Sequence, residues 1–376
     1  MRKKILMLAA FTFLGTTTLL AMGRRLEGAL NPTLLWEKEF PGSIIIDRNM
    51  KLARITGDVM VTVYPETREA EEIAGVYLFD KNGNEAHHWK KGFGTISDNG
   101  EKILFTSGPS GVPVHNKVHY CTRDGQELWN GRIGGEVYIS PDGSLVVDAS
   151  RAMDPSHLIE VYDATGKKIW SYKVAESLRV AFSPDSNYIG VSGGSAYSPV
   201  NKIRIYHRDG SILWAKERSD MGISCISEEA TFISTVKFIC DKAGNIISGG
   251  DWVDVVDSGK VFVSLSTGSV VVGTLPDKSV LRDYPIRNLW FDTHKVSRSI
   301  ISASYNGRYL ALFGERTDVV SPNNLFVLDT ETDQIWETKI EPAGKSESRL
   351  MQVLLTKDGK YMLVQAEGKL YYYQIY

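Results

Sequence analysis

Beyond residue 26, the chain alternates short apolar runs with compact polar turns. The runs are rich in β-branched and aromatic residues, and no long segment places apolar residues at helical spacing. Most of the turns contain glycine, aspartate or asparagine, which are the residues that tight hairpins require. This pattern predicts an all-β fold that is built from short strands.

The first recurring turn lies between two apolar runs and combines a hydroxyl residue with a carboxylate or amide and, usually, glycine. Copies stand at Ser97–Gly100, Ser140–Gly143, Ser183–Ser186, Ser304–Gly307 and Thr356–Gly359, with a degenerate copy at Asp47–Asn49. Ser97, Ser140 and Ser183 follow one another at intervals of 43 residues. A fixed interval of this size indicates a repeated structural unit.

A second turn comes later in each unit and leads to a tryptophan. The copies are Asp80–Gly83 before Trp89, Arg123–Gly125 before Trp129, Asp163–Gly166 before Trp170, Arg208–Gly210 before Trp214, and a weaker one at Asp329–Asp333 before Trp336. In the middle three copies, the tryptophan stands four residues after the glycine. A large ring at a fixed place in a strand predicts a wedge that packs between neighbouring sheets.

Two hairpin turns in each repeat give four short strands, and one such sheet cannot bury its apolar residues alone. Packing the copies around an axis solves this problem, so we expect a β-propeller. The first turn marks six units, and residues 221–300 must supply the rest. There Asp257–Lys260 is similar to the first turn and Pro276–Lys278 to a worn second turn, which favours seven four-stranded blades. Eight blades are the alternative, because Asp241–Gly244 could mark a further unit or an inserted hairpin.

The two ends of the chain look like the halves of one blade. Lys369–Tyr376 forms a strand that no tryptophan-bearing strand follows, whereas Leu34–Lys38 is a tryptophan-bearing strand that no unit precedes. We therefore expect the N-terminal strand to complete the last blade and to close the ring by hydrogen bonds between the two chain ends.

The first 25 residues have the layout of an export segment. A basic start is followed by 5–22, which carries no charge, and small residues stand where a signal peptidase cuts. Arg24 and Arg25 are unfavourable for cleavage, and the apolar stretch can also just cross a bilayer as a helix. We assign residues 1–25 to a signal peptide or an N-terminal membrane anchor and residues 26–376 to the propeller domain. Either alternative predicts an extracytoplasmic domain, which is periplasmic, secreted or held on the outer side of the cytoplasmic membrane.

Composition and charge exclude several classes of protein. The chain has 376 residues, 43% of them hydrophobic and 23% charged, which fits neither a disordered chain nor a polytopic membrane protein. A formal net charge of −2 offers no general attraction for phosphate backbones, so we expect no nucleic-acid partner. Three cysteines without a C-x-x-C pair argue against a disulfide scaffold and against a zinc site.

The segment Val161–Trp170 resembles the tryptophan-ended repeat of quinoprotein-like propellers, although the family motif usually has one more residue between the aspartate and Thr-Gly. The Ser-Pro-Asp-Gly turns equally resemble those of WD-repeat propellers. The resemblance extends over residues 34–376 as a repeat pattern and implies the propeller fold. The prototype of the first family binds pyrroloquinoline quinone, but the adjacent cysteines that some cofactor-binding members carry are missing here. We therefore expect no cofactor, and a quinone-dependent dehydrogenase is the least favoured function.

The histidines and cysteines form no linear motif. His87–His88 fits a solvent-facing pair on an outer strand. His115 and His119 are four residues apart, which would place them close together on one face of a helix or strand, but no further metal ligand stands nearby. Cys225 and Cys240 are expected on neighbouring strands of the irregular region. They would form a disulfide if their Cα atoms came within about 7 Å, and the sequence leaves this open. The chain has neither a phosphate-binding loop nor a G-x-S-x-G elbow. We therefore assign no catalytic, cofactor-binding or metal-binding residue.

Four long inserts precede the third strand of their units. They are Glu66–Glu72, Ser107–Pro113, Gly193–Pro199 and Thr317–Pro322. All connections between the second and third strands of a propeller emerge at one end, so these inserts would build a common face. A rigid scaffold with variable loops at one end is the usual arrangement of a binding surface, although insertions can also simply be tolerated.

We expect a monomeric scaffold that binds a protein or a cell-envelope component through this loop face, and we favour a non-enzyme. The alternative is a propeller-type hydrolase or lyase that acts on a glycan or peptide at the central channel. Charged or histidine side chains with shifted pKa values at the channel mouth would favour the enzyme. An exposed apolar loop face would favour binding.

Overall fold

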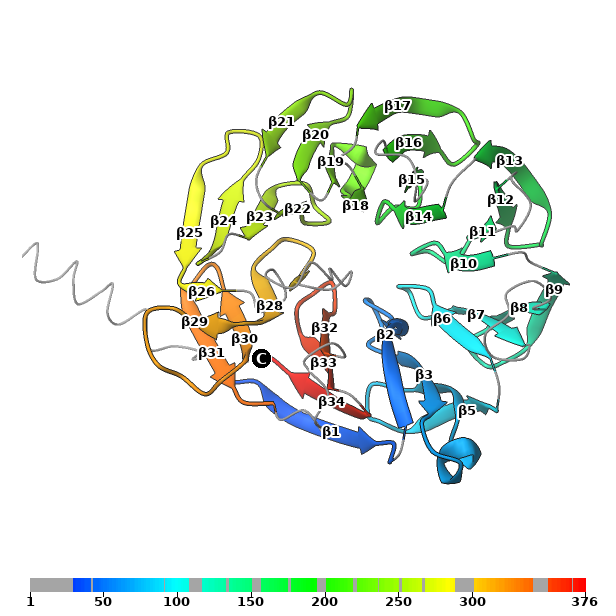
Figure 1. Cartoon of the computed structure of the whole chain (residues 1–376), viewed down its shortest axis with the longest axis horizontal. Coiled ribbons are helices and arrows are strands. Elements are labelled where there is room, and N and C mark those ends of the chain that lie inside the picture. Colours follow the sequence, from blue (N-terminus) through cyan, green and yellow to red (C-terminus); the bar gives the residue numbers. More distant parts are fainter. Residues whose placement is uncertain are drawn as a thin grey trace, which may run out of the picture.

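Eight four-stranded antiparallel sheets stand around a central axis in the computed structural model of the chain (Figure 1). The structure describes residues 30–41, 43–90, 92–107, 117–132, 135–150, 157–174, 177–194, 201–218, 222–235, 237–249, 252–265, 268–287, 301–340, 351–366 and 368–376. The predicted export segment lies outside the described residues. Within the described ranges, no helix combines the length and the apolar character that crossing a membrane requires.

The first six sheets each use four consecutive strands, and we number the sheets in chain order. The first sheet contains β2 (Ser43–Leu52), β3 (Val59–Pro65), β4 (Gly75–Phe79) and β5 (Glu85–Trp89), with the short helix η1 (Glu69–Glu72) between β3 and β4. The second contains β6 (Phe93–Ile96), β7 (Lys102–Ser107), β8 (Lys117–Thr122) and β9 (Glu127–Arg132). The third contains β10 (Gly135–Ile139), β11 (Leu145–Ser150), β12 (His157–Asp163) and β13 (Lys168–Val174).

The next three sheets repeat this order. The fourth contains β14 (Ser177–Phe182), β15 (Tyr188–Gly194), β16 (Asn201–His207) and β17 (Ile212–Arg218). The fifth contains β18 (Ile223–Ile226), β19 (Phe232–Thr235), β20 (Phe238–Asp241) and β21 (Ile246–Gly249), with the short helix η3 (Glu228–Ala230) after β18. The sixth contains β22 (Trp252–Val255), β23 (Val261–Leu265), β24 (Val270–Thr274) and β25 (Val280–Tyr284).

The last two sheets depart from the simple order. The seventh contains β27 (Ile301–Ala303), β28 (Tyr309–Phe313), β30 (Leu325–Asp329) and β31 (Gln334–Thr338), and a two-residue ladder pairs β26 (Ile286–Arg287) with β29 (Glu315–Arg316). The eighth runs in the order β1 (Thr33–Glu39), β34 (Lys369–Gln374), β33 (Tyr361–Ala366) and β32 (Met351–Leu355).

The favoured number of seven blades is wrong, because the described residues form eight four-stranded sheets. Residues 223–284 supply two complete sheets, the fifth and the sixth. The turn at Asp241–Gly244 is the hairpin between β20 and β21, so it belongs to a full unit. The first turn of that unit is η3, which has no glycine, and the residue four positions after Gly244 is a serine. The fifth sheet therefore lacks both signals by which the other units can be recognised.

The degenerate first turn at Asp47–Asn49 is also misplaced. These residues lie within β2, where the register with β3 shifts between Ile45 and Met50. The true turn is Ala53–Asp58, in which Gly57 adopts a φ of +82° and donates its N–H to the Ala53 carbonyl. A bulge in a strand and a turn use the same residue types, which explains the error.

The eighth sheet joins the two ends of the described chain. β1 pairs antiparallel with β34, from Thr33 opposite Gln374 to Glu39 opposite Lys369. The Trp36 ring stacks on Tyr372 at a centroid distance of 4.9 Å and an interplanar angle of 4°. The pairing that the chain ends suggest is therefore present, with β1 as the outermost strand (Figure 1).

The tryptophans of the second turn pattern pack between sheets. Trp129 lies over Gly166 of the next sheet, and Trp170 lies over Gly210, where an added Cβ atom would come within 2.6 Å of the ring. Trp170 also donates its Nε1–H to the carbonyl oxygen of Arg208 at 3.0 Å. These two indoles therefore pack the second and third sheets against a turn of the next sheet, and the predicted wedge is confirmed for these positions.

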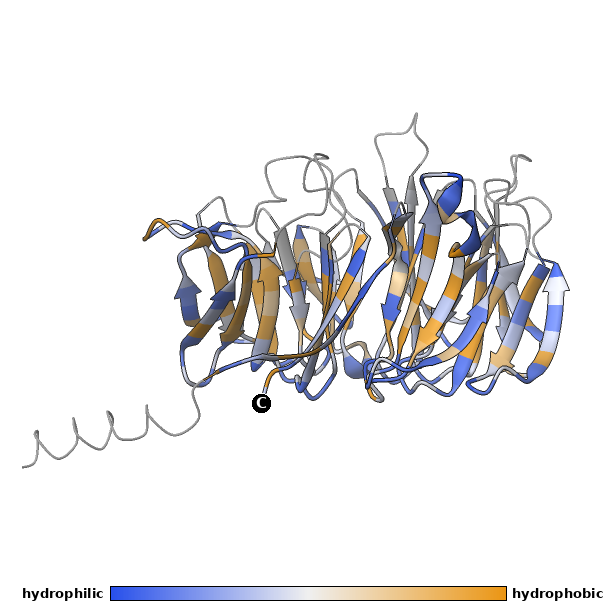
Figure 2. Cartoon of the chain, turned by 90° about the horizontal axis from the view of Figure 1, so that it is seen from below, coloured by the Kyte–Doolittle hydropathy of each residue, from blue (hydrophilic) through white to orange (hydrophobic). Residues whose placement is uncertain are grey.

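In the first sheet, a histidine takes the place of this tryptophan. His87 stands four residues after Gly83 and is the side chain that faces Gly125 of the second sheet, at 3.1 Å from an added Cβ. Trp89 lies two residues further along β5 and stacks on Phe105 with centroids 5.1 Å apart. The apolar core thus continues from sheet to sheet between the faces of the strands, which run between the two ends of the ring in Figure 2.

Candidate functional site

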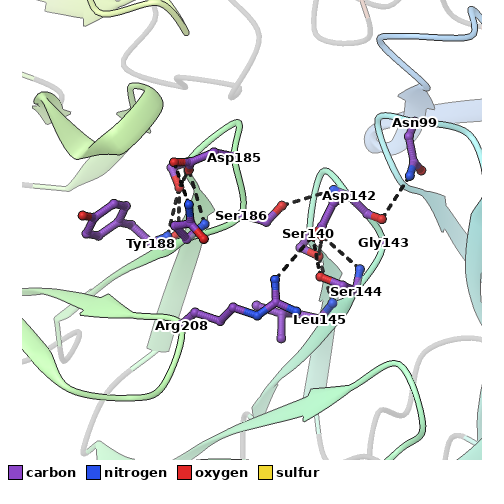
Figure 3. A network of polar contacts seen from close by, with 12 residues as sticks. Asn99, Ser140, Asp142, Gly143, Ser144, Leu145, Asp185, Ser186, Tyr188 and Arg208 are labelled. Atoms are coloured by element: carbon purple, nitrogen blue, oxygen red, sulfur yellow. Dashed lines mark hydrogen bonds and ion pairs between the residues drawn. The ribbon is translucent and has the colours of Figure 1, made fainter.

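The first turns of five sheets share one hydrogen-bond pattern, which explains their sequence. In the third sheet, the buried Ser140 hydroxyl donates to Asp142 at 2.6 Å and accepts the N–H of Leu145 at 2.9 Å (Figure 3). Gly143 closes the turn with a φ of +74°. Serine or threonine makes the same two contacts in the turns that begin at Ser97, Ser183, Ser304 and Thr356.

Hydrogen bonds connect these turns into a circle that passes through all eight sheets. We call this end of the ring the turn end. The donor and acceptor residues, in order around the ring, are Ile55 to Asp98, Asn99 to Pro141, Asp142 to Ser186, Glu229 to Asp185, Glu228 to Asp257, Ser258 to Tyr305, Tyr305 to Lys357, and Lys357 to Arg54. Figure 3 shows the part of the circle around Asp142. The backbone itself therefore helps to fix the order and spacing of the sheets at the turn end.

Arg54 is the main charged group of this circle. Its guanidinium forms an ion pair with Asp257 of the sixth sheet at 2.5 Å. It also donates to the carbonyl oxygens of Ala303 in the seventh sheet at 2.8 Å and of Leu355 in the eighth at 3.3 Å. One side chain of the first sheet thus bridges three other sheets, with three nitrogens each held by a protein acceptor. Although burial acts against the charge of Arg54, the carboxylates of Asp257 and Asp98 outweigh it and raise the pKa.

Three further side-chain contacts at the turn end join different sheets. The hydroxyl of Tyr305 in the seventh sheet donates to the Glu228 carboxylate in the fifth, and this hydrogen bond raises the pKa of Tyr305 to about 12. Asp98 of the second sheet lies 3.7 Å from Lys51 and 3.9 Å from Lys357. The charged side chains of the circle are therefore arranged in complementary pairs.

Asp254 lies beside this circle on β22, where it faces the fifth sheet. Its carboxylate accepts hydrogen bonds from the hydroxyl of Ser224 at 2.9 Å, from that of Ser234, and from the N–H of Val255 at 2.9 Å. Burial is the largest influence and raises the pKa of Asp254 to about 6, despite the hydrogen bonds that act in the opposite direction. Burial also raises the pKa of the nearby Cys225 thiol, followed by the charges of Asp254 and Asp257.

The chemistry of the turn end is mainly structural. The donors of Arg54 and the acceptor atoms of Asp254 already bind protein groups, and buried charges that are paired in this way hold neighbouring elements in one arrangement. No group of three or more His, Cys, Asp or Glu side chains that could hold a metal ion occurs within the described part of the chain.

The structure places the histidines differently from the expectation for a solvent-facing pair. The His88 ring stacks on Tyr77 with centroids 4.0 Å apart, and His87 stacks on Trp89 at 5.2 Å, so both rings belong to packed surfaces. His119 lies on β8 and binds Ser107 and Glu127, whereas His115 lies outside the described residues. The predicted closeness of His115 and His119 therefore stays a prediction.

Cys225 and Cys240 do not form a disulfide with each other. They lie on β18 and β20, and β19 runs between these strands, with Cys225 opposite Ser234 and Cys240 opposite Ile233. The expectation that the two residues occupy neighbouring strands is wrong, because residues 223–241 form three strands instead of two.

The inserts have the topology that the sequence predicts. Each of the four connects the second and third strands of its sheet, and we call the end of the ring from which they leave the insert end. Glu66–Glu72 and Thr317–Pro322 are described throughout, and the first contains η1. Residues 108–113 and 195–199 lie outside the described residues.

Comparison with solved structures defines the class of protein. The fold is that of a WD40-like β-propeller: the crystal structure of the C-terminal WD40 domain of Sif2 superposes with a TM-score of 0.52 and 11% sequence identity, covering 92% of this chain and 99% of that domain. No family model matches the sequence, and no curated protein matches it. At this level of identity the likeness shows the fold alone.

Proposed function

We propose that the chain is an extracytoplasmic scaffold that binds a protein or a cell-envelope component through its insert end. The fold supports this proposal, because a rigid ring that presents loops at one end is suited to recognition. The single observation that carries it is the exposed apolar tip of the insert in the seventh sheet, formed by Val319 and Val320.

This tip is held by contacts of the three residues that precede it in the chain, Arg316, Thr317 and Asp318. The Arg316 guanidinium binds the Asp318 carboxylate through two hydrogen bonds of 2.6 and 2.5 Å. Thr317 donates its N–H to the carbonyl oxygen of Pro285 at 2.9 Å and its hydroxyl to that of Gly268 at 3.2 Å. The loop that carries the valines is therefore fastened to the sixth sheet before any partner binds.

The valines themselves are turned to solvent. Val319 is 51% exposed and Val320 is fully exposed. Two adjacent apolar side chains on a fastened loop lower the entropy that binding costs, because the contact surface is already formed. Removing these apolar side chains from water in an interface also contributes favourable hydrophobic free energy to binding. We therefore assign the insert end, and this tip in particular, as the binding face.

Affinity capture from the cell-envelope fraction tests the proposal. We expect the wild-type chain to recover a partner in stoichiometric amount, and the variant Val319→Asp/Val320→Asp to recover at most a tenth as much. The matched control is Ile55→Asp, because Ile55 is similarly exposed, at 59%, but lies at the turn end. Equal recovery by the two variants, or loss with Ile55→Asp alone, would contradict the assignment of the binding face.

The extracytoplasmic location is tested on the same material. N-terminal sequencing of the recovered chain distinguishes a cleaved signal peptide, which exposes a new N-terminus near residue 24, from an uncleaved anchor, which retains Met1 and remains with the membrane pellet. Recovery of the chain with Met1 in the cytoplasmic fraction would refute both alternatives.

A further inference from the structure

Three side chains of the second sheet form a continuous hydrogen-bonded series. The hydroxyl of Ser107 lies 2.8 Å from Nε2 of His119, and Nδ1 of the same ring lies 2.5 Å from the Glu127 carboxylate. The residues come from three adjacent strands, Ser107 from the end of β7, His119 from β8 and Glu127 from the start of β9. From this geometry we propose that Ser107 is a nucleophile activated by His119, at a site that hydrolyses short-chain acyl esters.

The register of the strands explains how these residues meet. Phe105 is opposite His119 and Ser107 is opposite Lys117, so alternate residues of β7 and β8 place these four side chains on one face of the sheet. The bulge between Tyr120 and Cys121 brings Glu127 to the same face. A nucleophile, a base and a carboxylate at these spacings match the geometry of serine hydrolases on unrelated folds.

The hydrogen-bond pattern fixes the roles of the two ring nitrogens. An ionised carboxylate can only accept, so Nδ1 of His119 carries the proton that is donated to Glu127. The other nitrogen, Nε2, then has a free lone pair and accepts the proton of the Ser107 hydroxyl. The hydrogen bonds from His119 and Asn130 lower the pKa of Glu127, with that from His119 as the larger cause, which keeps this carboxylate ionised.

The surroundings hold the ring in this orientation. The imidazole of His119 stacks on Phe105 with centroids 4.6 Å apart and an interplanar angle of 10°. Asn130 donates its side-chain N–H to the other oxygen of Glu127. His119 and Ser107 thus occupy positions set by packing and hydrogen bonds, as an activated nucleophile requires, while Glu127 and Asn130 act as positioning residues.

The reaction balances with water as the second substrate. The Ser107 oxygen attacks the ester carbonyl carbon while its proton moves to Nε2 of His119. The C–O bond to the alcohol then breaks, and the departing oxygen takes the proton from Nε2. Water attacks the resulting acyl-serine, gives its proton to Nε2, and the carboxylic acid leaves as Ser107 regains its proton.

The charge and exposure of the site indicate the class of substrate. Lys117 lies opposite Ser107 on the same face of the ladder, where its positive charge favours the oxyanion that develops during attack. The side chain of Glu127 is 42% exposed and that of His119 is 15% exposed, so the series opens to solvent. An open site with one aromatic platform suits a small acyl group on a larger alcohol, rather than a long chain that must be enclosed.

Hydrolysis of p-nitrophenyl acetate by the full-length chain tests the proposal, together with labelling by a fluorophosphonate. We expect turnover at least 100-fold above the buffer rate, and a phosphonyl group on Ser107 in the peptide mass spectrum. Ser107→Ala should lose the label and at least 100-fold of the rate. His119→Gln should lose a similar factor and abolish the rise of the rate with pH. The control Ser211→Ala should leave both readouts unchanged, since Ser211 also donates to a carboxylate, that of Asp209, but has no imidazole partner among its described contacts.

Glu127→Gln separates a positioning role from a purely structural one. Removing the negative charge beside Nδ1 destabilises the protonated imidazole, so the pH at which the rate rises should move to lower values while the maximal rate falls more than tenfold. The proposal is overturned if the wild-type chain shows no turnover above buffer and no label on Ser107, or if Ser107→Ala retains the wild-type rate. Loss of partner capture by the valine variant described above has no bearing on this result, so the two proposals fail independently.

Discussion

Asp254 shows how one side chain can make the stability of this ring depend on pH. Its carboxylate lies between the fifth and sixth sheets, and burial raises its pKa from 3.8 to about 6. Between these two pH values, the folded chain holds a proton that the unfolded chain has lost. Stability therefore falls as the pH rises through this range, and above it the loss is complete.

We expect the variant Asp254→Asn to remove this dependence. The side-chain amide offers an acceptor and a donor to the hydroxyls of Ser224 and Ser234, and it does not titrate. We propose urea unfolding at pH 4 and pH 7 as the measurement. From pH 4 to pH 7, the free energy of unfolding of the wild type should fall by on the order of 2 kcal/mol more than that of the variant. If the free energies of unfolding of the two proteins differ by the same amount at pH 4 and at pH 7, Asp254 does not titrate in this range.

The sequence could not reveal Asp254 or the series around His119. Asp254 follows two apolar residues in a strand, and nothing in the linear pattern says that two serines of the preceding unit face it. Ser107, His119 and Glu127 meet because β7, β8 and β9 pair in a particular register with a bulge, and register is a property of the folded sheet. Residue types alone predict turns well, because a turn forms between residues that are close in sequence. They fail at these sites, because the contacts join residues on different strands.

At the scale of the elements, the contact between an indole and the glycine of the next sheet is the recurring joint. Gly210 has a φ of +89°, and the Trp170 ring lies where its Cβ would be. Trp170 cannot easily move away, because its Nε1–H is bound to the carbonyl oxygen of Arg208. The glycine is therefore required twice, once by the backbone conformation and once by the ring.

We expect Gly210→Ala to lower the free energy of unfolding by about 2 kcal/mol or more, through backbone strain and the clash with Trp170. Gly268→Ala is the matched control, because an added Cβ there has no atom within 4 Å and no positive φ opposes it. The control should stay within about 0.5 kcal/mol of the wild type. Urea unfolding monitored by tryptophan fluorescence measures the free energy of unfolding of both variants. Equal losses in the two variants would contradict the role assigned to the contact between Trp170 and Gly210.

The contacts between indole and glycine and the hairpin turns could be predicted where all the residues that form them are present in the local sequence. The spacing from Gly166 to Trp170 and from Gly210 to Trp214 predicted the wedge, and the Ser-Pro-Asp-Gly pattern predicted the hairpins. The fifth sheet escaped recognition because η3 replaces its first turn and Ser248 stands where the tryptophan would be. The predicted number of blades was therefore wrong because the fifth sheet makes its first turn with a short helix and without the recurring sequence pattern.

At the scale of the whole molecule, contacts stabilise the ring both near its axis and at its outer edge. Near the axis, the hydrogen-bonded turns and the Arg54 ion pair with Asp257 join sheets that are far apart in the chain. At the outside of the eighth sheet, β1 supplies the fourth strand from the other end of the chain. Every other sheet is made from one continuous segment of chain, so the eighth is the unit whose stability depends most on a contact between the two ends.

Removing β1 should therefore weaken the whole ring. We expect deletion of residues 1–41 to lower the free energy of unfolding by at least about 3 kcal/mol, because β34 loses its outer partner and Tyr372 loses the stacked ring of Trp36. The open edge of β34 should also make the shortened chain associate as its concentration rises. Deletion of residues 1–29 is the control, since it retains β1 and should unfold like the full-length chain.

A synthetic peptide of residues 30–41 distinguishes the loss of β1 from a general effect of shortening the chain. The peptide can restore the register from Thr33 opposite Gln374 to Glu39 opposite Lys369, and Trp36 can again donate its Nε1–H to the Lys81 carbonyl of the first sheet at 3.0 Å. We expect it to raise the unfolding midpoint of the shortened chain in proportion to the logarithm of its concentration, whereas a peptide with Trp36→Ala should need a tenfold higher concentration or more. If the shortened chain unfolds like the control, or if the peptide leaves its midpoint unchanged, the eighth sheet does not depend on β1 and the ring is held by the turn end alone.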